Sequence, residues 1–182
     1  MDINNDNEIV SLLKNPESKN AAFSIIVEKY SKQLYYHIRR IVIDHQDADD
    51  ILQDTFIKAF TKIDTFRSES GLYTWLYRIA TNTTLNFLAT KKRFYTFSAL
   101  SYEDTLAEKL EGSQYFDGDK LQTELQKAIL KLPEKQRLIF NMKYYDDLKY
   151  EEISEILGTS IGALKASYHH AVTKIEKYIN KL

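Results

Sequence analysis

The amino-acid sequence predicts an all-α protein of two small helical domains, joined by a flexible acidic linker. Only five glycines and two prolines occur in its 182 residues. Apolar residues recur mostly at spacings of three and four, as they do on one face of a helix, and no stretch alternates as a strand would. Residues 98–120 contain six acids and two lysines, and they separate two such helical regions. We therefore expect domains at 1–95 and 120–182, with a linker at 96–119.

The composition narrows the classes of protein that this chain resembles. It has no cysteine, which excludes a disulfide framework or a thiolate metal site and fits a reducing cytoplasm. The polar, acidic start MDINNDNEIV is not a signal peptide, and no apolar run approaches the roughly 18 residues of a membrane span. The net charge is −1, whereas a simple DNA-coating protein would be basic. If nucleic acid is the partner, the cations must be local or another protein must supply most of the affinity.

Three helices are expected in the first domain. The first spans residues 20–45, and the second spans 48–63 with Asp47 as its N-cap. The third spans 71–89, follows the loop FRSESG, and leads into a basic cluster. The inner face of the first helix is formed by Phe23, Ile26, Val27, Tyr30, Leu34, Ile38 and Ile41, and that of the second by Ile51, Leu52, Thr55, Phe56, Ala59 and Phe60.

Four aspartates crowd the start of the second helix. Part of this charge interacts favourably with the helix dipole, but four acids exceed what capping needs. Such a surface would repel DNA and could dock a basic protein surface. A solvated charged face is the alternative. The four residues are Asp47, Asp49, Asp50 and Asp54.

The third helix combines an apolar stripe with exposed rings, amides and cations. The stripe consists of Leu72, Trp75, Leu76, Ile79 and Ala80, whereas Tyr73, Tyr77, Arg78, Thr81 and Asn82 are expected to stay partly exposed, with Asn86, Lys91, Lys92 and Arg93 downstream. Rings stack on unpaired bases for roughly 1–3 kcal/mol each, and cations follow the backbone. Asparagine can read a base edge. This helix is therefore expected to bind single-stranded or opening DNA. The alternative is a surface helix whose rings pack on a neighbour, and for Trp75 the core is favoured over a base contact.

Residues 150–170, YEEISEILGTSIGALKASYHH, have the spacing of a helix-turn-helix. Gly158 suits a left-handed C-cap, and Ser160 can cap the next helix. That helix would turn outward Gly162, Ala163, Lys165, Ala166, Ser167, His169 and His170, whose small and polar side chains suit a DNA groove. An ordinary αα-hairpin is the alternative. Adjacent histidines diverge by about 100° on a helix, which argues against a metal site.

Five stretches in order carry a resemblance to a known family: DADDILQDTFIKAF, FRSESGLYTWLYRIATN, the basic KKR, LPEKQRLIF and YEEISEILGTSIGALKASYHHA. Together they resemble the extracytoplasmic-function group of bacterial sigma factors across nearly the whole chain. The resemblance implies a first domain that binds the β′ subunit of core RNA polymerase and then melts and reads the minus-ten promoter element. It implies a second domain that reads the minus-thirty-five element, and a linker that passes through the polymerase towards the RNA exit path.

The resemblance also assigns residues to these roles. It implies polymerase binding by Asp49, Asp50, Gln53, Asp54 and Phe56. It implies minus-ten contacts by Arg67, Tyr73, Trp75, Tyr77, Arg78, Asn82 and Asn86, with the basic cluster Lys91, Lys92 and Arg93 beyond them. It implies minus-thirty-five contacts by Ser160, Gly162, Ala163, Lys165, Ser167, His169 and His170, although many members carry arginine at the positions of Ser167 and His170.

The leading hypothesis is a promoter-specificity factor with no chemistry of its own. No nucleophile–base pair, paired carboxylates or phosphate loop indicates an enzyme, and no cofactor or metal is expected. The expected partners are core RNA polymerase, through its β′ and β subunits, promoter DNA and an anti-sigma factor, in the cytoplasm and without membrane insertion. A stand-alone helix-turn-helix regulator is the alternative, and a helical adaptor for another protein is a third reading.

Overall fold

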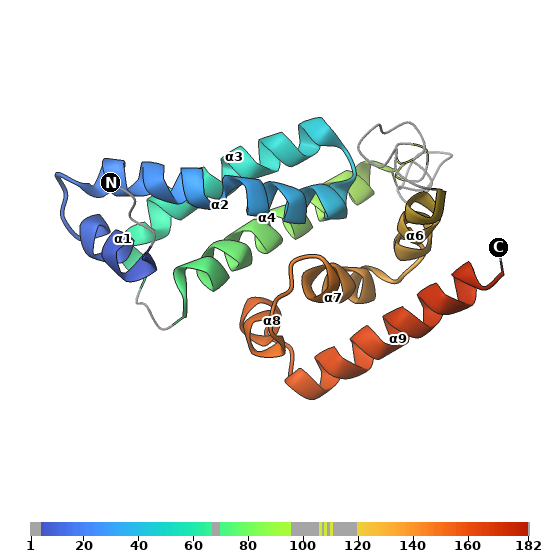
Figure 1. Cartoon of the computed structure of the whole chain (residues 1–182). Helices are drawn as coiled ribbons and strands as arrows, with labels where there is room; N and C mark the ends of the chain where they lie inside the picture. The colour runs from blue at the N-terminus through green and yellow to red at the C-terminus, as the bar shows by residue number, and fades with distance from the viewer. Residues whose placement is uncertain are drawn as a thin grey trace.

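The computed structural model describes residues 5–66, 70–95 and 120–181, together with Leu106, Glu108 and Leu110. In this part of the chain it contains eight α-helices, a single 3-10 turn and no strand, which confirms the expected all-α class. Figure 1 shows three long helices side by side, with a group of mostly shorter helices packed against one flank. We refer to α1–α4 as the N-terminal unit and to α6–α9 as the C-terminal unit.

The N-terminal unit consists of α1 (Asp6–Leu13), α2 (Lys19–Val42), α3 (His45–Lys62), the 3-10 turn η1 (Ile63–Thr65) and α4 (Leu72–Tyr95). The three long helices pack on one another pairwise, and α1 packs on α2. Helix α1 was not expected from the sequence. It is held to α2 through Asp6, whose carboxylate accepts hydrogen bonds from the Tyr30 hydroxyl at 2.6 Å and the Lys29 ammonium at 2.8 Å.

The C-terminal unit consists of α6 (Lys120–Leu130), α7 (Glu134–Tyr144), α8 (Tyr150–Leu157) and α9 (Ile161–Ile179). Helix α9 lies across the other three. A small apolar cluster joins α6, α7 and α9 and contains Ala128, Ile129, Leu132, Phe140, Ala171 and Ile175. The turn between α8 and α9 has the predicted geometry: Gly158 is left-handed with φ +61°, and the Ser160 hydroxyl accepts from the Ala163 amide.

Three expected helix boundaries are wrong. The N-cap of α3 is Asp44 instead of Asp47, because the Asp44 carboxylate accepts a hydrogen bond from the Asp47 amide at 3.0 Å. Ile43 takes the left-handed conformation with φ 63° and ends α2 three residues earlier than expected. Helix α4 runs to Tyr95 instead of ending near Ala89, so the basic cluster lies within its last turns.

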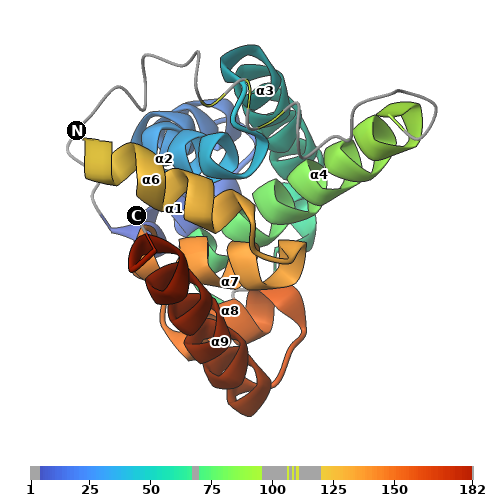
Figure 2. The ribbon, with the colours of Figure 1, turned by 90° about the vertical axis from the view of Figure 1, so that its right-hand side faces the viewer.

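The two units share one hydrophobic core. Helix α8 packs on α4, and α7 packs on α2, so that the C-terminal unit lies along one flank of the long helices (Figure 2). The main buried cluster includes residues of both units; those from the C-terminal unit are Leu138, Ile139, Met142, Leu148, Ile153, Ile156 and Leu164. Within the expected linker, Leu106 and Leu110 are also buried in this cluster, and most of that segment lies outside the described residues. The domain boundaries therefore stay a prediction.

Candidate nucleic-acid interface

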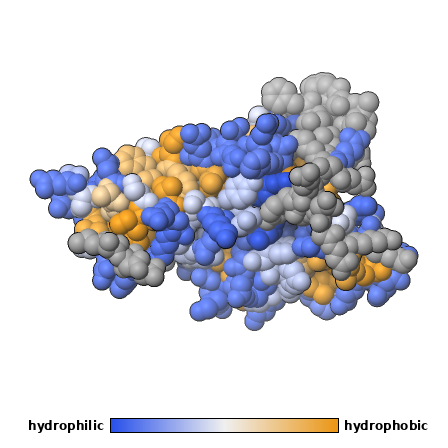
Figure 3. Space-filling view, turned by 45° about the horizontal axis from the view of Figure 1, so that its top comes forward, coloured by the Kyte–Doolittle hydropathy of each residue, from blue (hydrophilic) through white to orange (hydrophobic). Residues whose placement is uncertain are grey.

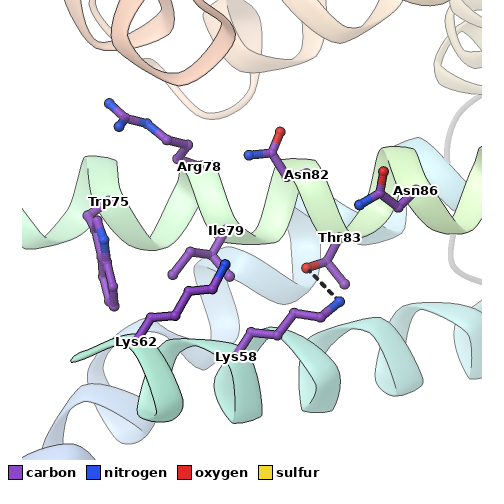
Figure 4. Close-up of a pocket in the computed structure, with 8 residues that line it drawn as sticks. All are labelled: Lys58, Lys62, Trp75, Arg78, Ile79, Asn82, Thr83 and Asn86. Carbon is purple, nitrogen blue, oxygen red and sulfur yellow. Dashed lines mark hydrogen bonds between the residues drawn. The ribbon is translucent and has the colours of Figure 1, made fainter. Parts of the chain in front are cut away.

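A pocket of about 290 Å³ opens between α3 and α4. Its walls are formed by Lys58, Lys62, Trp75, Arg78, Ile79, Asn82, Thr83 and Asn86. In Figure 4, Trp75, Ile79 and Thr83 lie on the side of α4 that faces α3, whereas Arg78, Asn82 and Asn86 project away from α3. One aromatic ring and two lysines therefore lie between the helices, and two amides and an arginine stand at the rim of the same pocket. Those are the groups that stack on a base, read its edge and follow its phosphates.

Among the described residues, the cations of this pocket have no anionic partner. No ion pair joins Lys58, Lys62 or Arg78 to any other described residue, and the Lys58 ammonium donates only to the Thr83 hydroxyl, at 3.4 Å. The Arg78 Nε is buried without a hydrogen-bond partner. Sequence reasoning missed Lys58 and Lys62. Their spacing of four places them on one face of α3, but only the packing of α3 against α4 shows that this face borders the pocket.

The structure brings several of the predicted minus-ten residues together, and separates others. Asn82 and Asn86 are exposed, and Arg78 is half-buried. Trp75 is half-buried as well, and its ring packs on Phe66 with centroids 5.2 Å apart. Part of its ring is therefore buried, and part is accessible from the pocket. Arg67 lies outside the described residues.

Two residues of this helix contradict the expected exposure. Tyr77 is 2% exposed and Thr81 is fully buried. On a helical wheel both lie off the apolar stripe, but His37 of α2 contacts both side chains, and α8 of the C-terminal unit also packs on α4. Tyr73 is half-buried and packs its ring against that of Tyr77, with centroids 4.5 Å apart and the ring planes tilted by 42°. Burial, and next the nearby Asp146 carboxylate, raise the pKa of the Tyr77 hydroxyl above its ordinary value.

The basic cluster at the end of α4 is partly paired with acids. The Lys91 ammonium lies 3.3 Å from the Asp47 carboxylate, and Lys92 forms an ion pair with Glu134 of α7. Arg93 is exposed. A nucleic-acid backbone that approached this end of α4 would compete with those two carboxylates, so the cluster is a weaker phosphate site than the sequence alone indicated.

The acidic residues of α3 form an exposed surface. Asp49, Asp50, Gln53 and Asp54 are exposed, and Phe56 is half-buried against Phe23. Further along the same helix Ile57 is 58% exposed and Phe60 is 39% exposed. Figure 3 shows apolar patches towards both ends of a face that is otherwise mostly polar. Carboxylates beside exposed apolar side chains are typical of a protein-docking surface with a hydrophobic centre.

The helix α9 presents the predicted outward face. Gly162, Ala163, Lys165, His169 and His170 are exposed and Ser167 is half-buried; Ser160 is exposed at the N-terminus. The opposite side is anchored by Leu164, Ala171 and Ile175. Tyr168 packs its ring parallel to that of Phe140, with centroids 5.8 Å apart. The arrangement of α8, turn and α9 therefore leaves a row of small and polar side chains on the second helix free to enter a groove.

Neither a metal centre nor a membrane span is present in the described part of the chain. Among these residues no group of three or more His, Asp or Glu side chains is placed to hold a metal ion. The same residues include no helix of sufficient length and apolarity to cross a bilayer.

Comparisons with known proteins give a consistent result. The family models for Sigma-70 region 2 and for Sigma-70, region 4 match residues 26–94 and 122–175. The chain is 33% identical over 169 residues to the ECF RNA polymerase sigma factor SigW of Bacillus subtilis, a match that covers 88% of this chain and 90% of the relative. It is 30% identical over 187 residues to the RNA polymerase sigma-H factor of Pseudomonas aeruginosa, covering 97% and 95%.

Solved structures share the fold. The sigma factor RpoE of Bartonella quintana, crystallised with the anti-sigma factor NepR, matches with a TM-score of 0.69 and 23% identity, covering 87% of this chain and 96% of that one. CnrH, in complex with the cytosolic domain of CnrY, matches with a TM-score of 0.71 and 20% identity, covering 97% of each chain.

Proposed function

Because this chain belongs to the extracytoplasmic-function RNA polymerase sigma factors, it is a promoter-directing initiation factor, and we propose which of its surfaces carries each step. Members of the family are not enzymes, and the same holds for this chain. The observation that carries the assignment of surfaces is the pocket between α3 and α4, where aromatic, amide and cationic side chains converge.

The pocket is the proposed capture site for the melted minus-ten strand. An unpaired base that entered it would meet the ring of Trp75 and the amides of Asn82 and Asn86. Lys58 and Lys62 add phosphate contacts from α3 that the family resemblance did not assign. Tyr73, Arg78 and Arg67 remain proposed strand contacts. Tyr77 is buried in the present arrangement, so it can contact the strand only after the C-terminal unit has moved away from α4.

The exposed surface of α3 is the proposed docking site for core polymerase. Asp49, Asp50, Gln53 and Asp54 supply charge and polarity, and Ile57 supplies an exposed apolar side chain beside them. Electrostatic complementarity would steer a basic partner surface to this helix, and burial of Ile57 would add about 1.5–3 kcal/mol if complete.

The exposed face of α9 is the proposed reader of the minus-thirty-five element. Ser160, Lys165 and the backbone at Gly162 lie at the start of the helix, where recognition helices contact base edges and phosphates. Ala163, Ser167, His169 and His170 extend this face. With a net charge of −1 the chain does not depend on its own charge for tight binding, because attachment to polymerase raises its effective concentration at the promoter.

Reconstitution with core polymerase tests this function. Polymerase with the wild-type chain is expected to start transcription at promoters whose start sites have been mapped after overexpression of the chain. Asp50→Lys should weaken polymerase binding by charge reversal, whereas Glu28→Lys, an equal reversal at an exposed position of α2, should not. Equal loss in both variants would remove the docking assignment, and failure of the wild-type chain at every mapped promoter would remove the function.

A gel shift without polymerase separates this function from the stand-alone regulator. A sigma factor is expected to bind duplex promoter DNA weakly by itself, since only part of its affinity comes from its own cations. Tight, sequence-specific binding of the isolated chain would favour the regulator instead.

We also propose a cytoplasmic location and control by an anti-sigma factor. The structurally similar sigma factor RpoE was crystallised with an anti-sigma factor, and the structurally similar CnrH forms a complex with the cytosolic domain of CnrY. The present chain shares their fold. A protein that copurifies with the tagged chain, and no longer does so once the genes that the chain controls are induced, would support this control.

A further inference from the structure

We propose that Asp146 is a latch that holds the free chain closed, with the C-terminal unit seated on the strand-reading helix α4. This closure is an arrangement of the chain itself and needs no partner. Its geometry rests on contacts in the structure alone. Its consequence for DNA rests on the proposed function of α4, and the experiment below separates the two.

The carboxylate of Asp146 joins the two units directly. It lies in the turn between α7 and α8, and its side chain is only 2% exposed. One oxygen accepts from the Arg40 guanidinium at 2.7 Å, and the other lies 2.6 Å from His37 Nδ1. Both partners belong to α2 of the N-terminal unit. Arg40 strengthens the link, because its guanidinium also lies 4.6 Å from the ring centre of Tyr145.

The same contact reaches α4 through His37. The other ring nitrogen, Nε2, lies 3.0 Å from the Thr81 hydroxyl, and the imidazole packs on the Tyr77 ring with centroids 4.9 Å apart. A neutral imidazole protonated on Nδ1 donates to Asp146 and accepts from Thr81, so each group is satisfied. One carboxylate of the C-terminal unit thereby fixes two helices of the N-terminal unit.

The turn that carries Asp146 is itself well ordered. The Asp146 amide donates to the Asn141 carbonyl at 3.2 Å, and the Leu148 amide donates to the Met142 carbonyl at 3.1 Å. The next residue, Asp147, has φ 51° and turns the chain outward, so its side chain is 96% exposed. Two neighbouring aspartates therefore have opposite environments, which provides a matched control.

Loss of the buried charge should favour separation of the two units without unfolding the chain. Asp146→Asn keeps the size of the side chain. Its amide nitrogen can only donate, so it cannot accept a hydrogen bond from whichever of Arg40 and His37 it faces. Removing one partner of a buried ion pair is strongly unfavourable, because the remaining charge stays desolvated. The apolar contacts of Leu148 and Ile153 remain, so a shift of at least about tenfold towards the open form is expected, instead of unfolding.

Two fluorescent labels measure the closure. The chain has no cysteine, so Lys32→Cys on α2 and Lys177→Cys on α9, both at exposed positions, can be labelled selectively for energy transfer. Asp146→Asn is expected to lower the transfer efficiency, and Asp147→Asn is expected to leave it unchanged. Circular dichroism checks the helical content. If Asp146→Asn loses its helices, Arg40→Gln, whose parent side chain is 18% exposed, takes its place with the same expected loss of transfer.

Strand binding gives the second readout, by anisotropy of a fluorescein-labelled single-stranded DNA of mixed sequence. The open variant is expected to bind this probe at least severalfold more tightly than the wild-type chain or Asp147→Asn. Equal transfer efficiency in the wild-type chain and in both folded variants, Asp146→Asn and Arg40→Gln, would overturn the latch. Opening without tighter strand binding would support the latch and remove Tyr77 from the proposed strand contacts.

Discussion

Lys58 and Lys62 bring two cations from α3 to a pocket whose other walls belong to α4. Neither lysine is paired with a carboxylate among the described residues, so each is available to a phosphate. A lysine that neutralises one phosphate of a single strand contributes about 0.7 to the slope of log affinity against log salt.

Replacing either lysine should therefore reduce that slope. Lys58→Ala and Lys62→Ala are each expected to lower it by about 0.7 when the polymerase complex binds a minus-ten single strand. Lys32→Ala removes an exposed charge of α2 that does not line the pocket, and it serves as the control. If all three variants reduce the slope equally, the pocket has no special role in holding the phosphates.

Residue exposure was the least predictable property of the site. The apolar stripe of α4 correctly identified Leu72, Leu76 and Ala80 as buried. Tyr77 is also buried, because a helix more than sixty residues away in the sequence packs over it, and no local pattern carries that information. Lys58 and Lys62 were missed because only the packing of α3 against α4 brings them to the pocket. Exposed acids such as Asp50 were predictable because no fold readily buries an unpaired carboxylate.

At the scale of elements, the turn between α8 and α9 was predicted in detail, because its signals are local. Gly158 and Ser160 are a left-handed cap and an N-cap, and each requires a particular residue type whatever packs around it. The start of α3 was misplaced because Asp44 and Asp47 are both good caps, and the choice depends on how α2 ends. Helix α1 was missed because it has only eight residues, too few for a clear apolar period.

The two glycines of this motif should respond to alanine in opposite ways. Gly158 has φ +61°, so Gly158→Ala is expected to cost about 1–2 kcal/mol of stability in urea unfolding. Gly162 lies in the first turn of α9 with open space around it, so Gly162→Ala should raise stability by up to about 1 kcal/mol.

The same two alanine variants distinguish an effect on stability from an effect on DNA recognition. If the backbone at Gly162 approaches the groove floor, Gly162→Ala should weaken initiation at promoters with a minus-thirty-five element while it stabilises the chain. A stabilised variant with undiminished promoter activity would show that the start of α9 does not approach the DNA closely.

At the scale of the whole molecule, two units to which we assign different functions share one core. The main cluster draws Leu148 and Ile153 of the C-terminal unit together with Leu76 and Tyr77 of α4. On the proposed function, α4 and α9 read two separate promoter elements, so we expect the arrangement that protects this apolar surface in the free chain to open at a promoter. The proposed docking surface of α3 is exposed in the closed arrangement, so the units need not separate before polymerase binds.

The shared core also makes a prediction about unfolding. Trp75 is the only tryptophan and lies in the N-terminal unit, so its fluorescence reports that unit alone, whereas far-UV circular dichroism reports helices of both. Because each unit loses buried apolar surface when the other unfolds, the two urea transitions of the wild-type chain should coincide. Asp146→Asn weakens the link between the units, so the two curves should separate in that variant and stay superimposed in Asp147→Asn. Distinct transitions in the wild-type chain would mean that the units are stable independently and that their common cluster adds little to either.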